Sequence, residues 1–169
     1  IQFDVYNWPV VNDSVVVKDC IIENNGPLTS DQNFNGGGIL IRGKRIYLLN
    51  NIIRNNIAGK GGGIGVNQSV NYTISGNVIE NNTIYGYQGG GALLSGSNVR
   101  FYNNIVKNNT SGNIVGYGYG GGLQTNYFNG EVVGNTFLEN YAKSTGGACY
   151  FGDQSSVVFH HNLVVKNST

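Results

Sequence analysis

Four tyrosines in two short Tyr-Gly-Tyr segments are the residues whose type and spacing best suit binding chemistry. Tyr85 and Tyr87 precede one Gly-Gly-Gly sequence, and Tyr117 and Tyr119 precede the next one along the chain. If the two segments occupy equivalent places in a repeat, we expect the four rings to lie close together on one flank. Aromatic faces beside hydroxyl and amide groups suit sugar rings or a protein partner. The alternative is that the rings pack over their own loops as a lid.

A compact basic turn is the second candidate binding site. Arg42, Lys44 and Arg45 flank a single glycine, and their cationic groups suit an anionic sugar, although a solvated turn is the simpler interpretation. His160 and His161 are adjacent, but no third ligand accompanies them, so we read them as surface histidines. We therefore predict no metal site and no cofactor.

Carboxylates are too scattered to indicate a catalytic site. A polysaccharide lyase needs carboxylates clustered around a calcium ion beside an Arg or Lys base, and an inverting hydrolase needs neighbouring acids. The aspartates share no position of the repeat described below: Asp4, Asp13, Asp19, Asp31 and Asp153. We predict no catalytic residue, and a carbohydrate-active enzyme stays the alternative to a binding protein.

Composition indicates an all-β chain. Of 169 residues, 27 are glycine, and only 11% are charged against the roughly 25% usual in globular proteins. Asn and Gly are poor helix formers, while Val, Ile, Tyr and Phe favour strands. The net charge of +1 favours neither nucleic acid nor an anionic membrane surface as partner. No apolar run approaches the ~18 residues that span a bilayer, so we expect no direct membrane insertion.

A repeat of the form polar-x-apolar-apolar-charged-Asn-polar organises the chain. Its copies start at residues 19, 50, 76, 103, 135 and 162, which gives intervals of 31, 26, 27, 32 and 27 by subtraction. Such a period is typical of a solenoid, and three short strands with glycine-rich corners favour a single-stranded parallel β-helix. We predict about six turns over residues 15–169, either complete or a segment of a longer rod. Residues 1–14 are predicted to form an N-terminal cap or an irregular strand.

Stacked turns convert positions of the repeat into ladders. The position after the charged residue is predicted to form an inward amide ladder: Asn24, Asn55, Asn81, Asn108, Asn140 and Asn167. An apolar ladder is expected to point inward: Ile21, Ile52, Val78, Ile105, Phe137 and Val164. Between them we expect a surface ladder of alternating charge: Glu23, Arg54, Glu80, Lys107, Glu139 and Lys166. After the glycines a second inward row is expected: Ile39, Ile64, Ala92, Leu123 and Ala148.

Asn-x-Ser/Thr sequons suggest glycosylation. Acceptors are predicted in turns or at strand edges: Asn12, Asn67, Asn71 and Asn109. Sequons at ladder positions are expected to be poor acceptors. The two cysteines, Cys20 and Cys149, lie about five turns apart, or more than ~20 Å at ~4.8 Å per turn. Because a disulfide needs Cα atoms within ~7 Å, we expect free thiols rather than a bridge within the coil.

Two short motifs carry a family resemblance. Gly146-Gly147-Ala148 and Phe137-Leu138-Glu139-Asn140 resemble the paired motifs of chlamydial polymorphic outer membrane proteins and related right-handed β-helix surface proteins. The resemblance covers nearly the whole chain and implies a right-handed coil, which pectate-lyase-like enzymes share.

We therefore expect an extracellular or cell-surface structural or adhesive module, glycosylated and stacking end to end into a filament. Its expected partners are further copies of itself and a glycan or surface protein. The alternative is a polysaccharide lyase or hydrolase, or the glycan-binding remnant of one.

Overall fold

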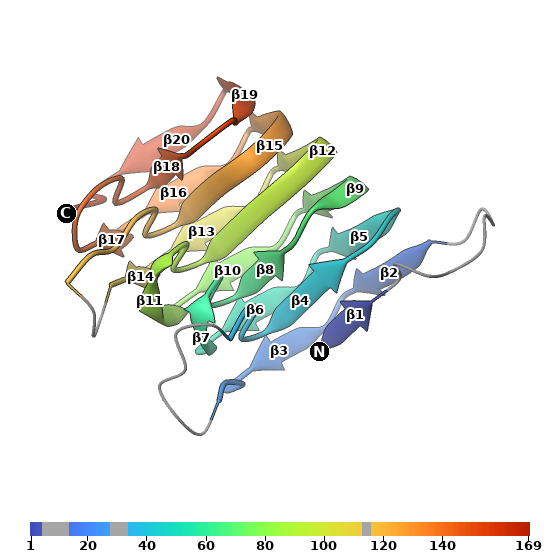
Figure 1. Ribbon diagram of the computed structural model, residues 1–169, viewed down its shortest axis with the longest axis horizontal. Helices are drawn as coiled ribbons and strands as arrows, with labels where there is room; N and C mark the ends of the chain where they lie inside the picture. Colours follow the sequence, from blue (N-terminus) through green and yellow to red (C-terminus); the bar gives the residue numbers. More distant parts are fainter. Residues whose placement is uncertain (5–13, 28–33, 113–115) are drawn as a thin grey trace.

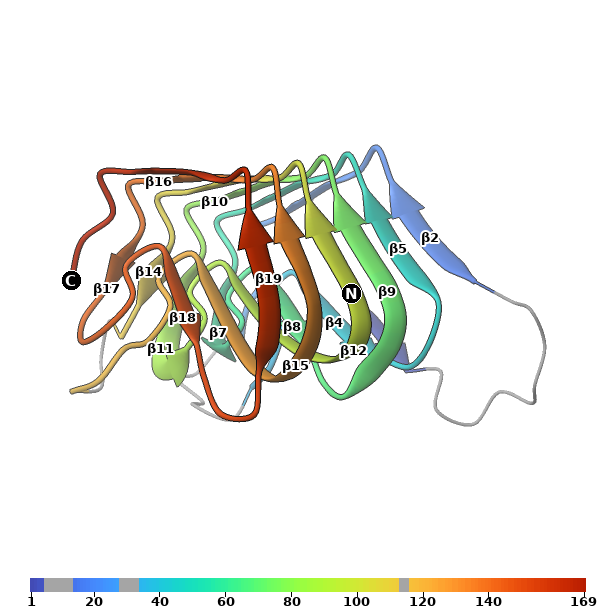
Figure 2. The same ribbon diagram turned by 90° about the horizontal axis from the view of Figure 1, so that it is seen from above.

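The computed structural model describes residues 1–4, 14–27, 34–112 and 116–169, and over these ranges the chain is built of strands and turns. Every strand pair is parallel, and each strand pairs with the equivalent strand of the next coil. Figure 2 shows β2, β5, β9, β12, β15 and β19 as successive rungs along one side of the coil. No helix within the described ranges could cross a membrane.

Three parallel sheets form the sides of the coil (Figure 1). The first sheet contains β1 (Gln2–Asp4), β2 (Val15–Lys18), β4 (Ile39–Arg42), β5 (Ile46–Leu49), β8 (Ile64–Val66), β9 (Ser69–Ser75), β12 (Ala92–Tyr102), β15 (Leu123–Val133), β18 (Cys149–Phe151) and β19 (Ser156–His160). The second contains β3 (Ile21–Glu23), β6 (Ile52–Arg54), β10 (Val78–Glu80), β13 (Ile105–Lys107), β16 (Thr136–Leu138) and β20 (Leu163–Val165). The third contains β7 (Ile57–Lys60), β11 (Thr83–Gln88), β14 (Thr110–Ser111) and β17 (Tyr141–Ala142).

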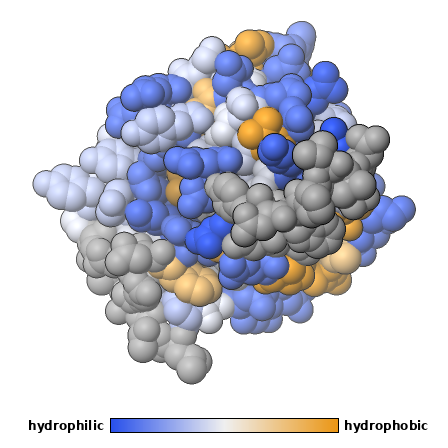
Figure 3. Space-filling model, turned by 45° about the vertical axis from the view of Figure 1, so that its right-hand side comes forward, coloured by the Kyte–Doolittle hydropathy of each residue, from blue (hydrophilic) through white to orange (hydrophobic). Residues whose placement is uncertain are grey.

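The six strands of the second sheet confirm the predicted parallel β-helix and are separated by five complete turns. Of the predicted N-terminal segment 1–14, residues 2–4 form β1, which pairs with β4, and residues 5–13 lie outside the described ranges. On the face shown in Figure 3, hydrophilic residues predominate and apolar residues form small separate spots.

The inward apolar row of the second sheet lies one residue later than expected in the first four coils. Ile21 and Ile105 are 61% and 43% exposed, so the prediction that their row points inward was wrong. The register instead aligns the core row: Ile22, Ile53, Ile79, Val106, Phe137 and Val164. Because successive strand residues face opposite sides, a shift of one residue exchanges the core face for the surface.

The amide ladder is also displaced by one residue in those coils. Asn24, Asn55, Asn81 and Asn108 are exposed corner residues with φ between 54° and 58°, and only Asn140 and Asn167 lie in the ladder as predicted. The long Asn ladder consists of Asn25, Asn56, Asn82, Asn109, Asn140 and Asn167. Asn tolerates the left-handed conformation better than most residues, so the first Asn of each pair turns the corner and the second points inward.

A second ladder, which the sequence analysis missed, stands at the other end of the second sheet. The short Asn ladder consists of Asn51, Asn77, Asn104, Asn135 and Asn162. Its members follow directly after another row of left-handed corners: Asp19, Asn50, Gly76, Asn103, Gly134 and His161. With this register the fourth repeat interval is 31 rather than 32 residues, as the Asn104–Asn135 hydrogen bond shows.

The surface charge ladder forms as predicted over four coils. Arg54 lies 2.7 Å from Glu23 and 4.0 Å from Glu80, and Lys107 lies 2.9 Å from Glu80. Glu139 and Lys166 were predicted as the last two members of this ladder. They form a 3.8 Å ion pair with each other, but they lie one residue further along the repeat, at the left-handed corners.

Glycines are required where the coils stack most closely. The third glycine of each triplet faces the carbonyl oxygen of the equivalent residue in the next coil. A Cβ at Gly91, for example, would lie 2.5 Å from the carbonyl oxygen of Gly122. In the last coil this position is Ala148, and Cys149 aligns with the core residue Leu123. The expectation that Ala148 belongs to the inward row was therefore wrong by one residue.

Candidate functional site

The four tyrosines occupy adjacent coils but have separate contacts. Lys60 Nζ lies 5.4 Å from the ring centre of Tyr87, whereas the ring of Tyr119 packs at 5.1 Å against Tyr150 of the following coil. Tyr117 is 66% exposed and Tyr85 is half-buried. Their role in binding stays a prediction.

The basic turn lies at the corner between β4 and β5. Lys44 is exposed, whereas Arg42 and Arg45 are half-buried. The turn is anchored by the backbone N–H of Gly43, which donates to Ser69 Oγ at 3.1 Å. A role for these cations in sugar binding also stays a prediction.

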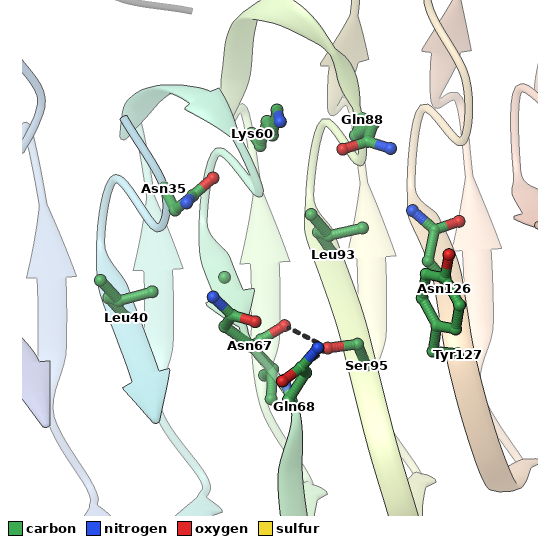
Figure 4. A pocket seen from close by; sticks show the side chains of 12 residues that line it. Asn35, Leu40, Lys60, Asn67, Gln68, Gln88, Leu93, Ser95, Asn126 and Tyr127 are labelled. Atoms are coloured by element: carbon green, nitrogen blue, oxygen red, sulfur yellow. Dashed lines mark hydrogen bonds between the residues drawn. The ribbon is translucent and has the colours of Figure 1, made fainter. Parts of the chain in front are cut away.

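A groove of about 280 Å³ crosses the outer face of the first sheet (Figure 4). Its floor is a row in which Leu40, Gly65 and Leu93 are aligned by the strand register. The backbone of Gly36 covers Gly65, where an added Cβ would lie 2.7 Å from Gly36 N. The apolar base of the groove is therefore formed by the side chains of Leu40 and Leu93.

Polar side chains form both rims of the groove. One rim consists of Asn35, Lys60 and Gln88. A parallel β-bridge joins the backbone of Asn35 to Lys60, and the pairing of β7 with β11 joins Lys60 to Gln88. The other rim is a corner that contains two residues in two of the coils and one residue in the coil between them, and we call it the bulge corner. It consists of residues 67–68 in one coil, residue 95 in the next and residues 126–127 in the third.

One buried amide oxygen on the rim of the groove, Oδ1 of Asn35, accepts no hydrogen bond from any described residue. A buried acceptor without a donor is unfavourable unless a ligand or water supplies one. Amide groups that can both donate and accept, set above an apolar floor, match the hydroxyl groups and the C–H face of a sugar.

The residues that line the groove include one cation, Lys60, and no Asp or Glu. Two-carboxylate glycosidase chemistry has no acid and base to use among these side chains. Elsewhere in the described ranges, no three His, Cys, Asp or Glu side chains form a group suited to a metal ion. His160 and His161, both exposed, contact each other through their Nδ1 atoms at 2.6 Å. The groove lining thus offers one ammonium group, amide groups and a phenol for contact with a ligand.

The predicted glycosylation sites differ in accessibility. Asn67 and Asn71 are exposed, and Asn12 lies outside the described residues. Asn109 is fully buried and donates hydrogen bonds from Nδ2 to Asn140 Oδ1 and Ile79 O. The prediction that Asn109 is a glycosylation site was therefore wrong. The error follows from the displaced ladder. For the same reason the sequon residues Asn81 and Asn108, which are exposed corner residues, were predicted to be poor glycosylation sites.

Both cysteines are free, at opposite ends of the coil. Cys20 is exposed and its backbone N–H caps the short Asn ladder by donating to Asn51 Oδ1 at 3.1 Å. The thiol of Cys149 packs against the core, and burial raises its pKa well above the ordinary range.

The residues of the bulge corner were not identified from sequence. Gln68, Ser95 and Tyr127 belong to no shared motif, and a single Ser stands where its neighbours have two residues. This difference becomes visible only after the strands on both sides of the corner are aligned.

Comparison with known proteins gives one match. Residues 9–169 match the family model described as a right handed beta helix region. No curated protein and no solved structure matches the chain significantly.

Proposed function

Because the chain belongs to the right-handed β-helix family, we propose that it is an extracellular or cell-surface adhesive module that binds a glycan in the groove over β8 and β12 without cleaving it. The groove itself is the observation that carries this proposal. Its amides, its single ammonium group and its leucine floor are complementary to a polyhydroxylated ring. The exposed tyrosine in its rim adds an aromatic surface of the kind on which sugars stack.

The scaffold supports this role because it holds the groove rigidly. Most groove residues lie on or beside β8, β12 or β15, and each of these strands is paired on both sides. The two Asn ladders join the coils behind it with side-chain hydrogen bonds of 2.8–3.0 Å. Sites built on such elements lose little conformational entropy when they bind.

The alternative function is a polysaccharide lyase or hydrolase. The family also suits that reading, but the groove lining supplies Lys60 alone as an ionisable group other than Tyr127. A lyase would need further cationic or metal-held groups to stabilise the enolate formed beside a uronate carboxyl.

Glycan-array binding followed by calorimetry tests the proposal. We expect binding to at least one neutral or acidic polysaccharide, with neither new reducing ends nor unsaturated-uronate absorbance after long incubation. Lys60→Ala and Gln88→Ala should each weaken binding, whereas Lys143→Ala, an exposed lysine outside the groove, should not. Turnover would favour the enzyme, and failure to bind any glycan would contradict the proposal.

End-to-end association is a second proposed property, supported by complementary atoms of the long Asn ladder. Each rung of this ladder uses the same bond, from the backbone N–H of one Asn to Oδ1 of the Asn in the following coil. A second copy in the same register would continue the ladder. Light scattering and negative-stain microscopy over a concentration series should show rods that lengthen with concentration, and a constant monomer mass would contradict this property.

A further inference from the structure

We propose that the bulge corner forms a subsite for a single sugar ring, so that the glycan lies along β12, across the coil axis, with one internal ring held between Gln68 and Tyr127. The inference rests on the proposed glycan-binding function and adds the direction, the ring position and the mode of binding. It derives from a difference in length between adjacent coils.

The strand register shows that the β12 coil is one residue shorter than both neighbours at this corner. Leu93 pairs with Gln124 and Gly96 with Phe128, so two residues of β12 face three of β15. On the other side Leu93 pairs with Gly65 and Gly96 with Ser69, so again two residues face three. Ser95 therefore stands alone between two projecting corners.

The missing residue leaves a gap of suitable width. Gln68 and Tyr127 are exposed and flank the buried Ser95, as Figure 4 shows. They belong to coils two rungs apart, about 9.6 Å at ~4.8 Å per rung. One ring in contact with a side chain on each face needs about 7–8 Å, at 3.5–4.0 Å per contact. A second ring in the same gap would exceed the available width.

The gap joins two hollows into one trough. Besides the groove of about 280 Å³, a second hollow of about 450 Å³ lies on the far side of the corner. Gln68 and Tyr127 line both hollows, and Gly96 and Ser97 form part of the second. A chain molecule can thus enter from one hollow, pass the gap and leave by the other, which suits an internal segment rather than a chain end.

The floor of the gap can accept a hydrogen bond but cannot donate one. Ser95 Oγ accepts a hydrogen bond from the backbone N–H of Gln68 at 2.7 Å and donates to Val66 O at 3.0 Å, so its one proton is committed and one lone pair is left. A ring hydroxyl directed at this floor can therefore only donate to Ser95 Oγ. Amide groups lie on the walls, at Gln68 and Asn126, where they can meet ring hydroxyls pointing along the coil axis. Asn126 Oδ1 also accepts from Gln124 Nε2 at 3.3 Å, which leaves its Nδ2 as the group to donate to a ring.

Tyr127 has the features of a binding platform rather than a structural residue. Its ring is 58% exposed and its φ of 50° lies in the left-handed region, which a tyrosine seldom adopts. The backbone N–H donates to Asp153 O at 2.8 Å, which holds the residue in place. A large side chain fixed in this conformation at the surface contributes little to packing, but it borders both hollows beside the gap.

Calorimetry with cellulose-, mannan- and polygalacturonate-derived oligosaccharides of one to eight units tests the inference. For the class that binds, affinity should rise steeply with length until both hollows are spanned, and capping both chain ends should leave it unchanged. Tyr127→Ala should weaken binding by about tenfold or more, and Tyr127→Trp should retain it. Tyr141→Ala, an exposed tyrosine in β17, is the matched control and should have no effect.

Ser97→Trp provides a second test that leaves the corner intact. The indole should fill the far hollow, so that long oligosaccharides bind no more tightly than short ones. Wild-type binding of a single sugar as tight as that of the longest chain, or a Tyr127→Ala change below twofold, would overturn the subsite while the glycan-binding function stands. Absence of binding to all three classes and to every glycan of the array would remove both.

Discussion

Two kinds of corner in the same coil behave in opposite ways. At the ends of the second sheet every coil turns with one left-handed residue. In each inner coil a buried Asn follows and hydrogen-bonds to the equivalent residues of the two adjacent coils. At the bulge corner the number of residues changes from coil to coil. Gln68 and Tyr127 are exposed there and have left-handed φ values, whereas Ser95 between them is buried.

This difference indicates which corners of the coil can change in length and sequence from one coil to the next. A ladder depends on identical geometry in each coil, because every amide both donates and accepts along the stack. A change in one member leaves its neighbours unpaired in a buried site. The bulge corner has no such dependence, so coils of unequal length can coexist there and enclose a groove.

The largest expected effect comes from Asn109→Asp. Asn109 Nδ2 donates at 2.9 Å to both Asn140 Oδ1 and Ile79 O, and a carboxylate would face these acceptors in a buried site without a proton to share. Unfolding in urea followed by circular dichroism should show a loss of about 3 kcal/mol or more. Asn108→Asp is the matched control at the exposed left-handed corner, and should cost less than about 0.5 kcal/mol. Equal losses would contradict the distinction between the two rows.

Gly91→Ala should have the next largest effect. The added methyl group would meet the carbonyl oxygen of Gly122 in the next coil, so we expect a loss of about 1–3 kcal/mol in the same urea assay. Ala148→Gly reverses the change at the equivalent position of the last coil. There the loss should be about 1 kcal/mol or less. A similar cost at both positions would show that stacking between coils does not set the glycine requirement.

Tyr127→Gly should separate stability from binding. Glycine relieves the left-handed strain but adds freedom to the unfolded chain, and the lost ring is largely exposed, so the net change in stability should lie within about 1 kcal/mol. Oligosaccharide affinity should nevertheless fall as it does in Tyr127→Ala. A large loss of stability would mean that the bulge corner is as structurally essential as the ladder corners.

The smallest expected effect concerns the two thiols. Cys20 should react with a thiol reagent in the folded protein, whereas Cys149 should react only after unfolding, because its thiol packs against the core. Since burial raises the pKa of Cys149, the unfolded state releases the proton at a lower pH than the folded state. Stability should therefore be full below the unfolded thiol pKa of about 8.5 and decline above it. Cys149→Ala should reduce that alkaline decline, and an unchanged pH profile would contradict the assignment.

Part of the candidate site could have been anticipated from the sequence. The residues directly after the glycine triplets were predicted to point inward, and successive strand residues face opposite sides of a sheet. The next residues, Leu40, Gly65 and Leu93, must therefore face outward, and the register aligns all three in the floor of the groove. Gln68 and Tyr127 could not be found in the same way. Their importance depends on the shortness of the neighbouring coil at Ser95, and no residue type marks a missing residue.

The sequence by itself determined that this chain is a coil of short parallel strands, because repeated Asn, Gly and β-branched residues recur at intervals that only stacked turns make regular. It also indicated the corners, since glycine and asparagine are the residues that accept left-handed backbone. Only the tertiary structure decided which Asn of each pair points inward, because a shift of one residue exchanges the two faces of a strand. The groove is likewise tertiary, since it arises from the difference in length between coils that lie side by side.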